Sequence, residues 1–260
     1  MRRNLVTCPD DLLLGQVAAL LLANRVHAIV VVGLNKEPLG IFSDTDLLAG
    51  EWLSIDDPSF QVMREMTVGE LMTSPPTTIA ADASLEEAAA RMRQEHISRM
   101  LVNDKESLVG VIAVSDLVAQ LGSAPGDGGT VADVMSRALV MCLPDTPIAA
   151  VAHAMHERRS RSVLVVSKRG VPLGVVTGID LLALYDGGED VGATVAEIMH
   201  TPVTIHPEAT LREAANAMLE NEIHRLLVVD SSDPDGMPLG LISTSDIVAE
   251  MAAPTSVWNT

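Results

Sequence analysis

Four copies of one seven-residue pattern constrain this chain more than any other feature of its sequence. Each copy has a glycine, two apolar residues, a small residue, two variable residues and an aspartate. An apolar stretch follows each aspartate, and all four copies keep the same register. Such self-similarity predicts a repeat architecture, in which each copy needs a neighbour to bury its hydrophobic face. The copies are Gly40–Asp46, Gly110–Asp116, Gly174–Asp180 and Gly240–Asp246.

The residues around each heptapeptide predict the same local structure in every copy. A short apolar strand such as 203–205 precedes a helix, and Thr210 with Glu213 forms the capping box that starts this helix. Two β-branched runs separated by a polar turn, such as 164–166 and 173–176, then predict a hairpin. The aspartate stands in the first turn of a second helix, where a carboxylate caps free amides. The fold class is therefore α/β (α+β), built from β-α-β-β-α units of about 60 residues.

A second pattern, Val-x-x-x-Met, opens the last three copies, at 68–72, 131–135 and 195–199. A unit of about 60 residues buries too little surface to be stable alone. We therefore expect unit 1 to pair with unit 2 and unit 3 to pair with unit 4, each pair sharing one core. The predicted boundaries are unit 1 with its connector at 1–66, unit 2 at 67–122, a linker at 123–129, unit 3 at 130–190, unit 4 at 191–253 and a tail at 254–260.

Charge and composition exclude several classes of function. The chain has 35 acidic and 17 basic residues and a formal charge of −18, so it repels DNA and anionic lipid. Its two Trp, two Phe and one Tyr provide no stacking surface for single-stranded nucleic acid. The longest apolar runs fall short of the roughly 18 residues of a membrane helix, and the N-terminus is a poor signal peptide. We expect a cytoplasmic protein that binds neither nucleic acid nor membrane.

The β-α-β-β-α unit, the Gly-x-x-Ser/Thr-x-x-Asp heptapeptide and the tandem arrangement resemble the CBS domain family, in which two domains form a Bateman module. The resemblance covers nearly the whole chain and implies two Bateman modules, 1–122 and 130–253. The adjacent His224 and Arg225 resemble the His-Arg pair of the gamma subunits of the AMP-activated kinase, which are nucleotide sensors with four CBS domains. The sequence contains no P-loop, nucleophile elbow, kinase motif or clustered metal-ligand motif, so we expect neither enzymatic activity nor a bound metal.

The small residue and the aspartate of the heptapeptide allow two interpretations. In the first, they cap the second helix, and the glycine allows a close backbone approach. In the second, the helix N-terminus and the hydroxyl bind a phosphate while the carboxylate accepts hydrogen bonds from a ribose diol. The resemblance implies this second role, as in CBS proteins that bind adenosine compounds, for Ser43 with Asp46, Thr177 with Asp180 and Ser243 with Asp246. In the second copy Asp116 is present, but Ala113 replaces the hydroxyl, which weakens the prediction of phosphate binding there.

Cations for the phosphate are predicted at the start of the second strand. Arg99, Arg161 and Arg225 are the candidates, because a guanidinium matches the oxygens of a phosphate. In the family, the phosphate usually meets the partner unit of the module. The resemblance therefore assigns Arg99 to Ser43 and Asp46, Arg225 with His224 to Thr177 and Asp180, and Arg161 to Ser243 and Asp246.

The base of the ligand is predicted to lie against the first strand. There, Thr78 with Ile79 and Thr204 with Ile205 supply backbone edges and an apolar wall. Adenine needs only backbone hydrogen bonds and apolar contact. The most complete candidate pocket belongs to the fourth copy and consists of Thr204, Ile205, Ser243 and Asp246, with Arg161 across the cleft.

We expect a regulatory protein. It binds an adenosine-containing ligand (AMP, ADP or ATP) in the clefts between paired units and transmits its state to a partner enzyme or transporter that the sequence does not identify. One alternative is a structural or interaction protein whose sites are degenerate, and another is a sensor of a different adenosyl ligand such as S-adenosylmethionine. Apolar helix faces such as 47–49 and 181–183 must be covered, so we expect a homodimer.

Overall fold

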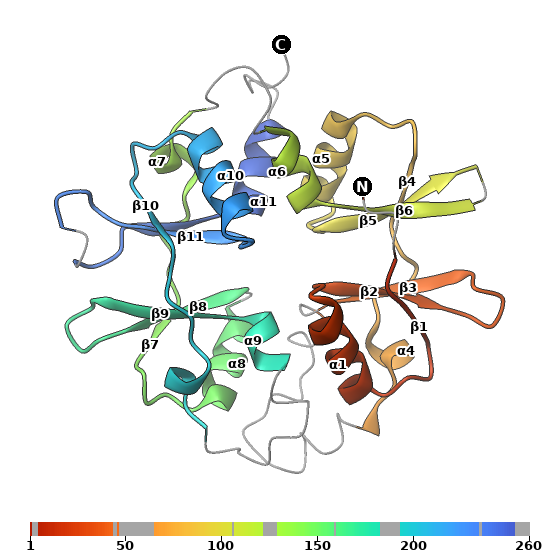
Figure 1. Ribbon diagram of the computed structural model, residues 1–260, viewed down its shortest axis with the longest axis horizontal. Coiled ribbons are helices and arrows are strands. Elements are labelled where there is room, and N and C mark those ends of the chain that lie inside the picture. Colours follow the sequence, from red (N-terminus) through yellow and green to blue (C-terminus); the bar gives the residue numbers. More distant parts are fainter. Residues whose placement is uncertain are drawn as a thin grey trace. The chain divides into compact units, whose positions relative to one another are not determined.

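The computed structural model describes residues 1, 5–43, 46, 65–105, 107–121, 129–158, 160–182, 193–233 and 236–252. Within these residues there are four three-stranded sheets, one for each sequence repeat (Figure 1). In each sheet the first strand is parallel to the second, and the second is antiparallel to the third. The predicted α/β fold, built from repeated β-α-β-β-α units, is confirmed.

The four repeats contain corresponding elements. Repeat 1 contains β1 (Thr7–Pro9), α1 (Leu14–Asn24), β2 (Ala28–Val32) and β3 (Pro38–Ser43). Repeat 2 contains β4 (Thr78–Ala80), α5 (Leu85–Gln94), β5 (Arg99–Asp104), β6 (Ser107–Ala113) and α6 (Val114–Leu121). Repeat 3 contains β7 (Met141–Cys142), α8 (Ile148–Glu157), β8 (Ser162–Val166), β9 (Pro172–Thr177) and α9 (Gly178–Leu182). Repeat 4 contains β10 (Thr204–Ile205), α10 (Leu211–Glu220), β11 (Arg225–Val228), β12 (Gly240–Ser243) and α11 (Thr244–Met251). The short helical turns that precede repeats 2, 3 and 4 are α4 (Val68–Leu71), α7 (Val131–Val134) and η2 (Val195–Glu197).

The predicted capping box at the start of α10 is confirmed. The hydroxyl of Thr210 accepts a hydrogen bond from the backbone N–H of Glu213 at 3.1 Å, and the carboxylate of Glu213 accepts one from the backbone N–H of Thr210 at 2.8 Å. The backbone and hydroxyl bonds from Thr210 hold the pKa of the Glu213 carboxyl below its usual value. Local spacing in the sequence is therefore sufficient to start this helix.

The Val-x-x-x-Met patterns lie in three short segments that pack against a repeat other than the one they precede in the sequence. We call these the exchanged segments, and they are 67–73, 130–136 and 194–200. Segment 67–73 precedes repeat 2 but packs on repeat 1, where Thr67 forms a bridge with Leu13 and Thr73 forms a bridge with Ile41 of β3. The backbone bonds between Thr73 and Ile41 run in both directions, at 2.9 and 3.1 Å. The segment therefore adds a short antiparallel contact to the third strand of repeat 1.

Repeats 3 and 4 exchange segments with each other. Segment 130–136 bonds through Ser136 to Leu241 of β12 in repeat 4. Segment 194–200 bonds through His200 to Val175 of β9 in repeat 3. Repeats that are neighbours in the sequence are thus linked by these segments, whereas sequence order alone associates each segment with the repeat that follows it.

The heptapeptide glycine is explained by the exchanged segments. A Cβ atom added to Gly174 would lie 2.6 Å from Sδ of Met199, and one added to Gly40 would lie 2.6 Å from Sδ of Met72. These distances are well inside van der Waals contact. The third strand therefore needs a residue without a side chain at the point where the methionine of an exchanged segment crosses it.

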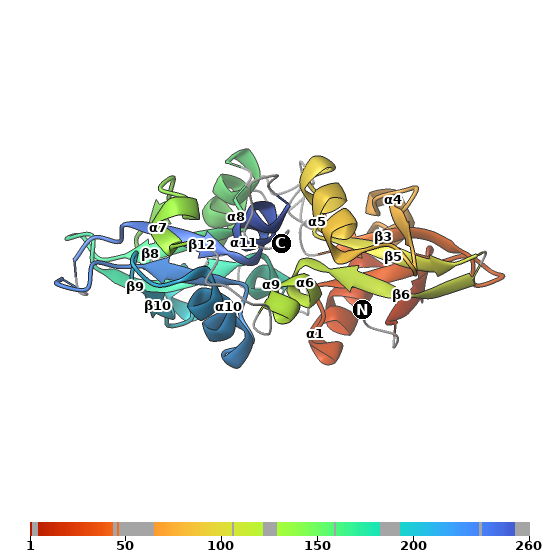
Figure 2. The same cartoon turned by 90° about the horizontal axis from the view of Figure 1, so that it is seen from above.

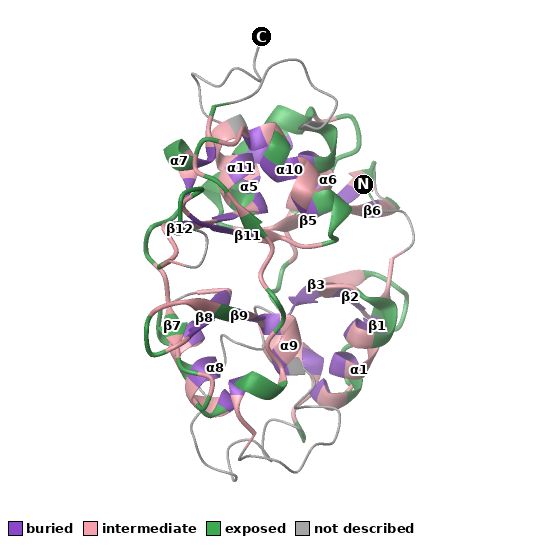
Figure 3. Ribbon diagram, turned by 60° about the vertical axis from the view of Figure 1, so that its left-hand side comes forward, coloured by how far each residue is buried: buried purple, intermediate pink, exposed green. Residues whose placement is uncertain are grey.

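The chain forms two compact units, each of which combines two repeats that are not neighbours in the sequence. The units are Met1–Asn4, Thr77–Leu139 and Pro202–Thr260, which contain repeats 2 and 4, and Leu5–Pro76 and Val140–Thr201, which contain repeats 1 and 3. In the first unit, α5 and α6 lie beside α10 and α11 (Figures 1 and 2). One core cluster spans both repeats and includes Ala88 and Leu117 of repeat 2 with Ala215 and Ile247 of repeat 4. Figure 3 shows buried positions on these four helices.

The second unit has a core cluster in each of its repeats. In repeat 1, Leu14 and Leu21 of α1 pack with Phe42 of β3. In repeat 3, Met155 of α8 packs in a separate cluster. Ile179 of α9 in repeat 3 packs against the cluster of repeat 1, so helices also join the two repeats of this unit.

Among the described residues, one core cluster therefore spans repeats 2 and 4, which are not neighbours in the sequence. The physical reason lies in small side chains. Ala88 and Ala89 of α5 and Ala214 and Ala215 of α10 are buried, and they allow helices of different repeats to approach closely. Burial of apolar area has no preference for neighbours in the sequence. Most of the predicted linker 123–129 and of the connector that ends at residue 66 lies outside the described residues.

Gly174→Ala is expected to destabilise the unit that contains repeats 1 and 3. The new Cβ has to displace Met199, and overpacking of this kind costs about 1–3 kcal/mol. Urea unfolding of the full chain measures the change in the free energy of unfolding. Gly33→Ala is the control, because the atoms nearest to a Cβ there belong to the flexible Glu37 side chain, and we expect it to cost less than about 0.5 kcal/mol. Equal losses in the two variants would contradict the role assigned to the heptapeptide glycine.

Candidate functional site

Each heptapeptide aspartate folds back onto the fourth residue of its own heptapeptide. In repeat 4, Oδ2 of Asp246 accepts hydrogen bonds from the backbone N–H and the hydroxyl of Ser243, at 2.8 and 2.7 Å. In repeat 3, Oδ2 of Asp180 accepts the same two bonds from Thr177, at 2.7 and 2.8 Å. The capping role is therefore present at both helices, and it uses one carboxylate oxygen of each aspartate.

Repeats 1 and 2 show which part of this cap is required. In repeat 1, Oδ2 of Asp46 accepts bonds from the backbone N–H and the hydroxyl of Ser43, both at 2.7 Å. In repeat 2, the backbone N–H of Ala113 donates to Oδ2 of Asp116 at 2.9 Å, and the alanine methyl group supplies no second bond. The backbone alone is thus sufficient to position the carboxylate, and the hydroxyl is an addition to it.

The second carboxylate oxygen, Oδ1, meets the last residue of an exchanged segment. The hydroxyl of Thr73 donates to Oδ1 of Asp46 at 3.0 Å, and Nε2 of His200 lies 2.8 Å from Oδ1 of Asp180. Sequence reasoning did not identify Thr73 or His200 as site residues. The signal was present, because each directly follows the methionine of a Val-x-x-x-Met pattern.

Repeat 4 differs at this position. Its exchanged segment ends at Ser136, and no hydrogen bond joins Ser136 to Asp246 in the part of the chain that the structure describes. Within that part, Oδ1 of Asp246 has no hydrogen-bond or ion-pair partner. Because the cap holds the carboxylate by its other oxygen, Oδ1 is fixed in place and available to a donor such as a ribose hydroxyl.

His200 covers the corresponding carboxylate of repeat 3. The side chain of His200 is 70% exposed, whereas that of Asp180 is 8% exposed. The imidazole therefore lies between the carboxylate and the solvent. A ribose hydroxyl that approaches Oδ1 of Asp180 has to displace this ring.

The basic pair of repeat 4 flanks the capped turn of its own repeat. Arg225 pairs in register with Ser243 across β11 and β12. The carbonyl of His224 accepts a hydrogen bond from the backbone N–H of Thr244 at 3.0 Å. Two basic residues thus stand beside the N-terminus of α11, where the helix dipole also favours an anion.

Arg99 and Arg161 stand at corresponding places in other repeats. Arg99 starts β5 opposite Ala113, and Arg161 directly precedes β8. The sequence prediction assigns Arg99 to a ligand at repeat 1, Arg161 to one at repeat 4 and Arg225 to one at repeat 3. These assignments join residues of the two compact units, so they stay predictions.

The first strand of repeat 4 presents an open backbone edge. The N–H of Leu227 bonds to the carbonyl of Val203 at 2.9 Å, and the N–H of Val229 bonds to the carbonyl of Ile205 at 3.0 Å. Thr204 lies between these two acceptors, so its carbonyl points away from β11 toward the free edge of β10. The backbone edge predicted at Thr204 is exposed, while Ile205 packs against the core. In repeat 2, Ile79 of β4 is likewise buried in the core.

The strand order separates the two halves of the pocket predicted in repeat 4. β10 and β12 lie on opposite sides of β11. Thr204 pairs with Leu227, which pairs with Leu241, so Thr204 and Leu241 are about 10 Å apart, or two strand spacings, and Ser243 lies two residues further along β12. The cause is the β-α-β crossover, which places the first strand beside the second and leaves the third strand at the far edge. The pocket predicted for repeat 4 therefore has to span the width of this sheet, and it stays a prediction.

The described ranges of the chain lack the features of a metal site and of a membrane-spanning helix. No group of three His, Cys, Asp or Glu side chains in those ranges is placed to hold a metal ion. No helix in them has the length and apolar character that crossing a membrane requires. Burial raises the pKa of the Cys8 thiol to about 11, so at neutral pH it is protonated and a poor nucleophile.

Comparison with known proteins gives a family match over most of the chain. The family model described as the CBS domain matches residues 1–51, 68–123, 131–187 and 195–253. The inosine-5'-monophosphate dehydrogenase of Nitrosopumilus maritimus (strain SCM1) is 28% identical over 131 residues, which are 50% of this chain and 26% of that protein. The uncharacterized protein MJ1404 of Methanocaldococcus jannaschii is 26% identical over 200 residues, which are 75% of this chain and 45% of that protein. The chain thus spans less than half the length of these two relatives.

Two solved structures share the fold over nearly the whole chain. Protein MJ1225 of Methanocaldococcus jannaschii superposes with a TM-score of 0.82 at 22% identity, covering 95% of this chain and 96% of that chain. A conserved protein of Pyrococcus horikoshii superposes with a TM-score of 0.63 at 23% identity, with the same coverage of 95% and 96%. At these identities the likeness shows the fold alone.

Asp246→Ala is expected to destabilise the unit that contains repeats 2 and 4 in the absence of any ligand. The variant removes two hydrogen bonds that hold the start of α11, and the loss of a helix cap costs about 1 kcal/mol. Thermal and urea unfolding of the full chain measure the change. Asp82→Ala makes the same change of charge at an exposed turn and serves as the control. If both variants unfold like the parent chain, the hydrogen bonds of Asp246 do not stabilise the helix.

Proposed function

We propose, from the premise that the chain belongs to the CBS domain family, that it is a non-catalytic regulatory protein that binds an adenosine-containing nucleotide. The observation that carries the proposal is the carboxylate of Asp246. Its Oδ2 is held by the helix cap, and its Oδ1 makes no hydrogen bond in the described part of the chain. A carboxylate oxygen presented in this way accepts hydrogen bonds from the two hydroxyls of a ribose.

The surroundings of Asp246 favour a phosphate on the same ligand. The N-terminus of α11 carries the positive end of the helix dipole, and the hydroxyl of Ser243 lies at this end. The arginine predicted for this phosphate is Arg161, while Arg225 with His224 is predicted for the ligand at Thr177 and Asp180. In a chain with a formal charge of −18, a guanidinium beside a helix N-terminus supports a site for an anion.

The adenine of the ligand is proposed to lie at the edge of a first strand. There, its amino group donates to an outward-facing carbonyl such as that of Thr204. Because β10 and β12 lie on opposite sides of β11, one nucleotide that contacts both Thr204 and Asp246, as predicted, extends across the width of this sheet. AMP, ADP and ATP share the groups that these contacts use.

We propose further that nucleotide binding changes the state of a partner enzyme or transporter and that the protein is a cytoplasmic homodimer. The apolar face 47–49, on which the dimer prediction rests, lies outside the described residues. Of the second face, 181–183, Leu181 is buried in the core of repeat 3 and needs no partner to cover it. The homodimer is therefore supported by the sequence pattern alone.

A structural or interaction protein is the second candidate, because the heptapeptide aspartates cap their helices without any ligand. Calorimetric titration of the full chain with AMP, ADP, ATP and S-adenosylmethionine distinguishes the two functions. Saturable binding of an adenine nucleotide supports the regulatory protein, and tighter binding of S-adenosylmethionine identifies a different adenosyl sensor. If none of the four compounds binds, the structural or interaction protein is the function that the result supports.

Asp246→Ala is expected to lower the affinity for AMP at least tenfold. The variant removes two charge-assisted hydrogen bonds to the ribose, each worth about 1.5–3 kcal/mol, and about 1.4 kcal/mol corresponds to one decade in Kd. Titration calorimetry measures the affinity. Asp116→Ala is the matched control, because repeat 2 has Ala113 in place of the hydroxyl. If Asp246→Ala melts early yet binds AMP as tightly as the parent chain, the aspartate is a cap and not a ligand.

His200→Ala is expected to strengthen AMP binding at repeat 3. The variant removes the ring that competes for Oδ1 of Asp180, and a partly exposed pair of this kind contributes about 0.5–1 kcal/mol, or about two- to fivefold in affinity. The same titration measures this gain. His206→Ala is the control, because its ring lies beside the carbonyl of Val229 and touches no heptapeptide aspartate. A loss of affinity in His200→Ala would show that the imidazole itself contacts the ligand.

A further inference from the structure

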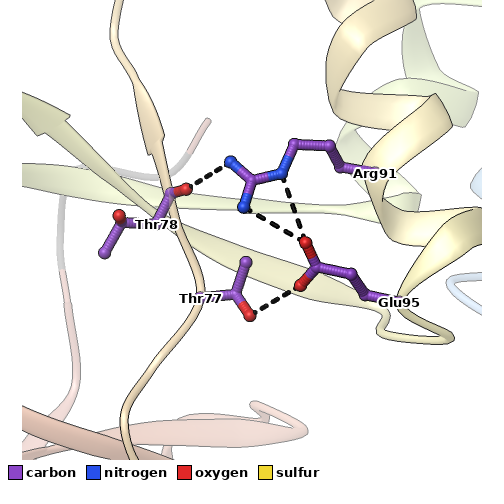
Figure 4. Close-up of polar contacts among 4 residues, drawn as sticks. All are labelled: Thr77, Thr78, Arg91 and Glu95. Atoms are coloured by element: carbon purple, nitrogen blue, oxygen red, sulfur yellow. Dashed lines mark hydrogen bonds and ion pairs between the residues drawn. The ribbon is translucent and has the colours of Figure 1, made fainter.

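The edge of β4 in repeat 2 is filled by side chains of the protein itself. Nη1 of Arg91 on α5 donates to the carbonyl oxygen of Thr78 at 2.7 Å (Figure 4). Nε and Nη2 of Arg91 lie 3.3 and 3.2 Å from Oε1 of Glu95. Oε2 of Glu95 accepts a hydrogen bond from the hydroxyl of Thr77 at 2.9 Å. An arginine and a glutamate, one helical turn apart, thus join the helix to the strand edge.

The carbonyl of Thr78 is the acceptor that an incoming base would use. The N–H of Leu101 bonds to the carbonyl of Thr77 at 2.9 Å, so Thr78 turns its own carbonyl away from β5, as Thr204 does in repeat 4. The amino group of adenine is a planar N–H donor, and so is the guanidinium of Arg91. The arginine therefore occupies the position, and makes the hydrogen bond, that the proposed function gives to the base.

The other three repeats have no arginine at this place. Arg91 is the seventh residue of α5, and the seventh residues of α1, α8 and α10 are Leu20, Ala154 and Ala217. None of these three side chains can donate a hydrogen bond to a strand edge. Yet all four sheets have the same strand order and the same parallel and antiparallel pairing.

The fold of repeat 2 therefore does not require the arginine. The side chains of Arg91 and Glu95 are 36% and 38% exposed. An ion pair that is exposed to this extent contributes little to stability. The arrangement is an addition that only repeat 2 carries on a strand edge common to all repeats.

We propose that Arg91 reduces the number of nucleotides that the chain holds, by closing the edge of β4 against an adenine base. This inference rests on the proposed function, because it concerns the base position of that function. The seventh residue of α10 in repeat 4 is Ala217, whose side chain supplies no donor to the edge at Thr204, whereas the carbonyl of Thr78 already accepts a bond from Arg91. Removal of the arginine frees the carbonyl of Thr78 for a ligand.

Equilibrium dialysis of the full chain against AMP tests this inference through the number of AMP molecules bound per chain at saturation. Arg91→Ala is expected to bind one AMP more than the parent chain. Arg93→Ala is the matched control, because Arg93 is exposed on the same helix and its loss changes the net charge equally. An unchanged number of bound AMP molecules in Arg91→Ala, with melting behaviour like that of the parent chain, overturns the inference.

The reverse exchange tests the same inference at a second site. Ala217→Arg combined with Asn221→Glu places the arginine and glutamate at the matching positions of α10 in repeat 4. This double variant is expected to bind one AMP fewer than the parent chain, and Asn221→Glu alone is expected to bind the parental number. An unchanged number in a folded double variant counts against closure of the edge by arginine.

The outcome also distinguishes this inference from the proposed function. A parent chain that binds no AMP contradicts the proposed function. A parent chain that binds AMP, together with an unchanged number of bound AMP molecules in Arg91→Ala, overturns this inference and leaves the proposed function in place. If neither the parent chain nor Arg91→Ala binds AMP, both proposals are wrong.

Discussion

The contact between a glycine of the third strand and the methionine of an exchanged segment determines the rest of the arrangement. Gly174 admits Met199, and Gly40 admits Met72, because neither glycine has a Cβ atom in the way. The methionine fixes the segment on the strand, and the next residue of the segment then reaches the heptapeptide aspartate. The hydrogen bond from the exchanged segment to the aspartate therefore depends on the absence of a side chain at the glycine.

The heptapeptide aspartate serves two purposes with two different oxygens. Oδ2 accepts a hydrogen bond from the backbone N–H of the residue three positions earlier in all four repeats. Oδ1 meets a hydroxyl in repeat 1 and an imidazole in repeat 3. The partners of Oδ1 thus differ between repeats because of segments that pack on the heptapeptide from elsewhere in the sequence. Four copies of one motif need not have four equivalent sites.

The parts of the fold that the sequence predicts are those in which the interacting residues lie within one helical turn. Ser243 with Asp246 and Thr210 with Glu213 are examples, since the spacing alone brings donor and acceptor together. Thr73 reaches Asp46 from 27 positions away, through a segment whose packing partner is not apparent from local spacing. The small face of α10 likewise predicts burial without naming the helix that covers it. Local sequence patterns do not predict the order of strands in the sheet either, because they do not show which segments pack together.

The exchange of segments changes what a fragment of this chain contains. A fragment that starts at residue 194 and includes repeat 4 carries the segment that packs on repeat 3. It lacks Ser136, whose backbone bonds to Leu241 and whose carbonyl oxygen would lie 2.7 Å from a Cβ on Gly240. In such a fragment, water replaces the missing backbone partner and the crevice over the glycine lies open. The shortest fragment that contains repeat 4 together with the exchanged segment packed on it therefore begins near residue 130. Whether a fragment holds a complete repeat depends on where in the sequence that exchanged segment lies.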